Sequence, residues 1–202
     1  MGLTLWFSLV IICLLGAMSP GPSLMVVLRH SLSNGRRHGI LAALAHGAGV
    51  AGWAMLTISG LALLVTEQPA LFRLFTYASA GYLAWMGVKA LRSKGQTLLE
   101  IDKAQASLAE AARDGAVIAL LNPKLAVFFF ALFSQFVSAE MASTDQWITV
   151  LTVASIDSLW YIAVAVIVSN TRFLERLQKQ SVVIDRISGL VLVGLALRVV
   201  SL

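Results

Sequence analysis

Residues 17–26, AMSPGPSLMV, place Pro20, Gly21 and Pro22 inside the first apolar stretch of the chain. Proline lacks the backbone N–H and its ring clashes with the preceding turn, so this cluster should end a helix. Apolar residues continue on both sides, however, and no polar loop receives the chain. The segment therefore predicts a helix that is interrupted in the middle of an apolar span.

The composition of the 202-residue chain indicates a membrane protein. Hydrophobic residues make up 58% and charged residues 12%, whereas soluble domains are about 25% charged. The net charge is +5, but the basic residues lie in short gaps between apolar runs, which argues against a nucleic-acid partner. The single cysteine, Cys13, excludes an internal disulfide. No charge precedes Arg29, so we expect no cleavable signal peptide.

Apolar stretches of about 20 residues can cross the hydrocarbon core as helices. The sequence contains six such stretches, at 4–28, 39–65, 70–90, 115–138, 147–169 and 185–202. We therefore expect an all-α membrane protein with six transmembrane helices. A single transporter domain would cover residues 1–202, with three helices in 1–92, a cytoplasmic loop at 93–114 and three helices in 115–202.

The basic residues predict the orientation. Of the 15 Lys and Arg residues, 12 lie at or between the span ends that border the first, third and fifth connections. The second and fourth connections hold Arg73 against Glu67, Glu140 and Asp145. Because cytoplasmic loops carry the excess of basic residues, we expect both termini to be external.

The longest connection has apolar residues at helical spacing, which predicts a short amphipathic helix on the cytoplasmic membrane face. It would be either a plain connector or a regulatory or partner site. The residues concerned are Ile101, Ala104, Leu108, Ala111 and Ala112.

The two halves of the chain resemble each other at offsets of about 100 to 108 residues. SPGPSLMVVL from Ser19 matches NPKLAVFFFA from Asn122, and SAGYLAWMGVKALR from Ser79 matches ISGLVLVGLALRVV from Ile187. With three spans per half, the second half starts on the opposite side of the membrane, which predicts an inverted repeat of the kind found in transporters. Chance similarity between apolar segments is the alternative.

Ser19-Pro20 and Asn122-Pro123 share one pattern, a helix-capping residue before a proline that is favoured at the first helical position. We expect each to end one half-helix and to start another. At about 1.5 Å per residue, the two breaks lie roughly 10 and 13 Å from the cytoplasmic side, with their helix starts facing one another. Such starts bind anions. The predicted substrate-binding residues are Ser19, Pro20, Gly21, Pro22, Asn122, Pro123, Lys124 and Tyr161.

Three ionisable residues fall at the same depth, where charge is costly and by default functional. Asp157 would couple protons or bind substrate, or else be a structural partner of Lys124. Lys124 would bind a substrate carboxylate or extend toward the cytoplasm. His46 would be a packing residue or a proton carrier. Tyr161 lies one turn from Asp157. We take Asp157 and His46 as candidates for proton coupling.

The chain resembles the LysE/RhtB amino-acid exporters of bacterial inner membranes. SPGPSLMVVLRHSLSNGRRHGILAALAHGAG, LLNPKLAVFFFALFSQFV, SIDSLWY and DRISGLVLVGLALRVVSL carry the resemblance. It implies proton-driven export of amino acids or related small metabolites, in a multi-pass inner-membrane protein. Many relatives have an aspartate in the second span, where this chain has Val50. Asp157 would then work alone or with His46.

Other classes fit less well. An aspartyl intramembrane protease needs two membrane aspartates, and a serine type needs a Gly-x-Ser-Gly loop, which TISG and RISG lack. We therefore expect no enzyme, no cofactor and no metal. A passive channel or a non-transporting scaffold stays open. The expected partners are a small-molecule substrate, protons and the lipid bilayer. The small residues Ala42, Ala45, Gly49 and Gly52 predict a helix-packing seam, and close-packing glycines permit a homodimer.

Overall fold

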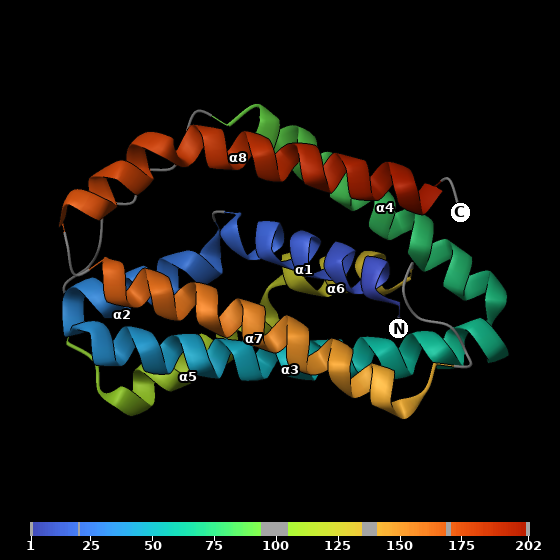
Figure 1. Ribbon diagram of the computed structural model, residues 1–202, viewed down its shortest axis with the longest axis horizontal. Helices are drawn as coiled ribbons and strands as arrows, with labels where there is room; N and C mark the ends of the chain where they lie inside the picture. The colour runs from blue at the N-terminus through green and yellow to red at the C-terminus, as the bar shows by residue number, and fades with distance from the viewer. Residues whose placement is uncertain (1, 20, 94–104, 135–140, 169–170, 201–202) are drawn as a thin grey trace.

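The secondary structure that the computed structural model describes is helical throughout (Figure 1). The model describes residues 2–19, 21–93, 105–134, 141–168 and 171–200. Pro20, Ile101 and Ala104 therefore lie outside the described residues. The helices are α1 (Leu3–Met18), α2 (Pro22–Asn34), α3 (Arg36–Glu67), α4 (Pro69–Leu91), α5 (Leu108–Leu121), α6 (Pro123–Phe133), α7 (Ser143–Ile167) and α8 (Thr171–Val200).

Both predicted breaks are present, since α1 and α2 are bent by 61° and α5 and α6 by 53°. The second break begins as predicted. Asn122 caps α6 by accepting the Lys124 backbone N–H at 3.0 Å, and Pro123 takes the first turn.

The first break differs from the expectation, because Ser19 ends α1 instead of capping α2. Its backbone N–H still donates to the carbonyls of Leu15 and Gly16, so Ser19 belongs to the last turn of α1. The N-cap of α2 is Gly21, and Pro22 takes the first helical position.

Two helices, α3 and α7, are each long and apolar enough to cross a membrane, and the count rises to four if each bent pair is one span. The helices at the predicted third and sixth spans, α4 and α8, do not meet that criterion. Six spans therefore stay a prediction. The helix at the last window extends beyond it, because α8 begins at Thr171 rather than near residue 185. Its first turns are polar, and a search for apolar windows passes over them.

The expected amphipathic helix is not separate where the structure describes it. Leu108 starts α5, which continues without interruption into the predicted fourth span. A capping box at Ser107 and Glu110 sets this start: Ser107 Oγ accepts the Glu110 N–H, and the Glu110 carboxylate accepts the Ser107 N–H. The box satisfies backbone donors of the first turn, and nothing before Leu121 breaks the helix.

The described helices run roughly along the long axis of the molecule (Figure 1). α3 packs along α5 and α7, and α4 packs along α8. The start of α1 and the end of α8 lie toward one end, and the connection between α2 and α3 lies toward the other (Figure 1).

Glycines let two helix pairs approach closely. A Cβ added to Gly115 would lie 2.1 Å from the carbonyl oxygen of Ala42, and one added to Gly87 would lie 2.8 Å from that of Gly189. The α3–α5 and α4–α8 backbones are therefore in contact, as small residues allow in membrane helices. Gly52 does not belong to the predicted seam, because a Cβ there would have no neighbour within 4 Å.

Candidate functional site

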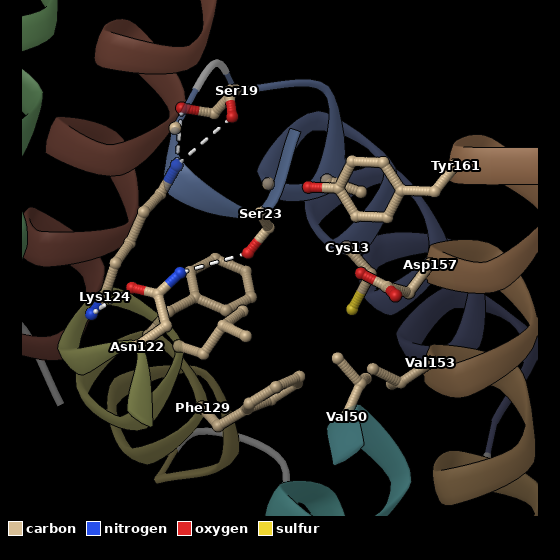
Figure 2. A pocket seen from close by; sticks show the side chains of 15 residues that line it. Cys13, Ser19, Ser23, Val50, Asn122, Lys124, Phe129, Val153, Asp157 and Tyr161 are labelled. Atoms are coloured by element: carbon tan, nitrogen blue, oxygen red, sulfur yellow. Dashed lines mark hydrogen bonds between the residues drawn. The ribbon is translucent and has the colours of Figure 1, made fainter. Parts of the chain in front are cut away.

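The starts of α2 and α6 lie against each other, although they come from opposite halves of the chain. Asn122 Nδ2 donates a hydrogen bond to Ser23 Oγ at 3.1 Å. Lys124 Nζ donates to Ser19 Oγ at 2.8 Å and to the Ser19 carbonyl at 3.4 Å (Figure 2). Gly21 borders the same contact, since a Cβ there would lie 3.7 Å from Lys124 Nζ. The two breaks thus form one polar junction.

A small cavity, which we call the inner cavity, adjoins this junction. Its volume is about 40 Å³, enough for roughly three water molecules. Its polar wall brings together residues from both breaks and from α7 (Figure 2), and it includes Ser19, Asn122, Lys124, Asp157 and Tyr161. The cavity therefore unites most of the predicted substrate residues with Asp157.

The rest of the inner cavity is apolar. Cys13, Val50, Phe128, Phe129 and Val153 line it, and each is at most 5% exposed. Val50 stands where the family resemblance implies an aspartate in many relatives. That position therefore faces the same space as Asp157 in this chain.

Asp157 is paired with His46. His46 Nδ1 and Asp157 Oδ2 are 2.7 Å apart, and the two residues are 0% and 6% exposed. His46 Nε2 has no hydrogen-bond partner among the described residues. The His46 ring also meets the Tyr161 ring edge-on, with centroids 5.1 Å apart. Sequence reasoning named both members but could not place them in contact.

The Lys124 ammonium lies at the helix breaks. Its contacts are with Ser19, whereas the Asp157 carboxylate contacts His46. The Lys124 amine and the Asp157 carboxyl group therefore line the same cavity without contacting each other: Lys124 is hydrogen-bonded to Ser19, and Asp157 to His46.

A second and larger cavity, which we call the vestibule, also borders the junction. It is open and measures about 760 Å³. It shares Ser19, Gly21, Asn122 and Lys124 with the inner cavity. These four residues form a partition between the two spaces. Pro22 and Pro123 line only the vestibule, so the predicted substrate residues are divided between the two cavities.

Asp185 in the vestibule wall is a residue that sequence reasoning missed. It lies within α8 and is 5% exposed. It stands at the edge of the predicted span 185–202, where a charged residue is taken as the end of the apolar segment. The apolar run just before it, Val182 to Ile184, is the signal that places it inside a helix.

Apolar helices, two broken segments and a buried polar junction at the breaks are typical of membrane translocators. Residues 14–202 match the model of the LysE type translocator family, and the chain belongs to that family. It is an integral membrane protein of a translocator family, not of an enzyme family. The resemblance that the motifs indicated is confirmed.

Curated relatives cover nearly the whole chain. A leucine efflux protein of Enterobacter sp. (strain 638) is 30% identical over 91% of this chain and 89% of its own length. The threonine efflux protein of Escherichia coli (strain K12) is 26% identical over 98% of both chains. An uncharacterized membrane protein of Haemophilus influenzae is 30% identical over 91% of this chain and 90% of its own. No solved structure matches the chain.

Proposed function

We propose that the chain exports small neutral amino acids across the bacterial inner membrane in exchange for protons. The family and the names of its leucine and threonine efflux relatives support amino-acid export. The observation that carries the site is the position of Lys124 and Asp157 in the wall of one cavity at the helix breaks. This geometry suits a molecule with one carboxylate and one ammonium.

The substrate carboxylate would bind at the junction. The N-termini of α2 and α6 both open there, and helix N-termini attract anions. Lys124 adds a full positive charge and a donor, and a charge-assisted hydrogen bond is about twice as strong as a neutral one. The Asn122 amide and the Ser19 hydroxyl supply further polar contacts. Gly21 leaves space beside the Lys124 ammonium.

The substrate side chain would occupy the apolar part of the inner cavity. Val50, Phe129 and Val153 offer no charged partner, which favours aliphatic or small side chains. At about 40 Å³, the cavity is too small for an amino acid, so binding requires the partition to open. In an alternating-access cycle, the inner cavity would first open to the vestibule through the partition. It would then close there and open to the opposite side of the membrane.

Asp157 would exchange a proton for the substrate ammonium. In its charged form it attracts the ammonium, and protonation removes that attraction, so proton entry is linked to substrate release. His46 would accept or supply the proton through its contact with Asp157, and its Nε2 leaves a second position for a relay. With Val50 at the usual aspartate position, this pair would carry the coupling.

We also propose the finer topology. The pairs α3–α7 and α4–α8 each join helices that hold corresponding places in the two halves, as two inverted three-helix repeats would require. The start of α1 and the end of α8 lie toward the same end of the molecule (Figure 1), in keeping with six spans and with both termini on one side, which we propose is the external side. A homodimer is compatible with the glycine-rich helices.

The test is efflux of labelled leucine and threonine from proteoliposomes, with and without an imposed proton gradient. Export by the proposed mechanism responds to the gradient, whereas a passive channel conducts without regard to it and a scaffold gives no flux. Asp157→Asn should abolish gradient-driven export while substrate exchange continues. Glu67→Gln is the matched control, because it makes the same chemical change at an exposed helix end. Normal gradient-driven export by Asp157→Asn would refute the coupling role.

A further inference from the structure

The vestibule contains a carboxylate as well as the shared Lys124. Asp185 lies in its wall and is only 5% exposed. Its Oδ2 accepts a hydrogen bond from Ser93 Oγ at 2.5 Å, so the carboxylate is held in place by a residue just after the end of α4. A buried carboxylate is costly unless it is hydrogen-bonded or paired, and one that lines a cavity is a candidate binding group.

Each of the two cavities that Lys124 lines also contains a carboxylate. Asp157 lines the inner cavity and Asp185 lines the vestibule. Asp185 and Lys124 line the vestibule together. Both cavities therefore pair the same cation with a different acid, and the partition between them is the contact of Lys124 with Ser19 (Figure 2).

The vestibule also differs from the inner cavity in its net charge. Lys89 and Arg92 line it together with Lys124 and Asp185. The ammonium of Lys89 lies 5.3 Å from the centroid of the Trp85 ring, which also faces the vestibule. The excess of positive charge attracts a carboxylate, and it repels a ligand that carries a second ammonium or guanidinium group.

We propose that the vestibule is a loading site in which Asp185 binds the ammonium of a zwitterionic amino acid while Lys124 binds its carboxylate. This inference rests on the proposed export function. When the contact of Lys124 with Ser19 opens, the carboxylate stays with Lys124 and the ammonium moves from Asp185 to Asp157. The amino acid thus moves from the vestibule to the inner cavity while its carboxylate stays bound to Lys124.

Selection among amino acids then begins before the inner cavity is reached. A 2-keto acid lacks the ammonium for Asp185, and an amino-acid amide lacks the carboxylate for Lys124. A basic amino acid has a second cation that Lys89 and Arg92 repel. A zwitterion without a second cation satisfies both ends.

The experiment compares wild type with Asp185→Asn and Asp185→Glu in reconstituted full-length protein. The initial rate of gradient-driven leucine export is measured against leucine concentration on the loading side. We expect Asp185→Asn to raise KM by about tenfold or more, as loss of a charged hydrogen-bond partner does, with a smaller change in kcat. Asp185→Glu should recover part of the affinity. Glu67→Gln, at an exposed position, should match wild type.

Equilibrium binding of labelled leucine separates the two sites. Asp157→Asn should still bind leucine through the vestibule, and the double variant Asp157→Asn with Asp185→Asn should lose binding. The melting temperature of each variant in detergent shows whether it is folded. An unchanged KM for folded Asp185→Asn would overturn the inference while leaving the exporter proposal intact. Absence of gradient-driven export by wild type would instead overturn the proposed function.

Discussion

Lys124 and Ser19 are joined by a hydrogen bond of 2.8 Å from the ammonium to the hydroxyl oxygen. The two residues come from breaks in opposite halves of the chain. Their contact separates a cavity that contains Asp157 from one that contains Asp185. Neutral oxygens of one residue, the hydroxyl and the carbonyl of Ser19, therefore hold the cation that lines both cavities.

Replacing Lys124 tests the carboxylate-binding role. We expect Lys124→Gln to raise the KM for leucine export by at least about tenfold, because a hydrogen bond to a charged group contributes about 1.5–3 kcal/mol. Arg73→Gln is the control, since it removes an exposed cation from α4. Concentration-dependent efflux from proteoliposomes measures both. An unaltered KM for Lys124→Gln would exclude the contact with substrate.

Replacing His46 tests whether it shares the coupling proton. Glutamine can still donate to Asp157 but does not titrate near neutral pH. We therefore expect His46→Gln to change the shape of the pH profile of gradient-driven export between about pH 5 and 8. His38→Gln should keep the wild-type profile. If His46→Gln lowers the export rate but keeps the wild-type pH profile, His46 only positions Asp157 and does not carry the proton.

Asn122 holds the junction with both ends of its amide. In Asn122→Asp the side chain can still cap α6, but it loses the donor to Ser23 and places a negative charge where the substrate carboxylate would bind. We expect this variant to lose more export than Asn122→Ala. The alanine variant should be the less stable one, because loss of a cap costs about 1 kcal/mol. Efflux and melting temperature together check both statements, and the reverse order of export would contradict the site.

The α3–α5 contact predicts a contrast between two glycines. Gly115→Ala would place a methyl group 2.1 Å from the backbone oxygen of Ala42, and relief of such overpacking costs about 1–3 kcal/mol. Gly52→Ala meets open space and should be neutral or slightly stabilising through helix propensity. Thermal unfolding in detergent compares them. Equal melting temperatures would show that the helices are not packed as described.

Local features of the site were predictable from the sequence, because capping depends on neighbouring residues. Asn122-Pro123 is one polar residue before one proline, and it starts α6 as expected. The first break offers Ser19, Pro20, Gly21 and Pro22 as possible starts. Which one begins α2 depends on how long the preceding turn keeps its backbone hydrogen bonds, and no local pattern decides that. Ser19 remained with α1 for this reason.

Contacts between distant segments were not predictable in the same way. His46 and Asp157 are 111 residues apart, and only the packing of α3 against α7 brings them together. Asp185 was overlooked because hydropathy windows treat a charge at their edge as a boundary. The same limit applies to the start of α8 at Thr171, where polar residues form a helix that no apolar window detects.

The neutrality of Ser19 has a consequence for what opens the site. If residue 19 had a carboxylate, it would form an ion pair with Lys124. That carboxylate would be as strong an acceptor as the substrate carboxylate, so substrate could not readily displace it. A hydroxyl and a peptide carbonyl are weaker acceptors than the carboxylate of an amino acid. The carboxylate of a bound amino acid would therefore replace Ser19 as the hydrogen-bond partner of Lys124. Under the proposed function, substrate binding would itself release Lys124 from Ser19, so we expect the contact to stay in place while no substrate is bound.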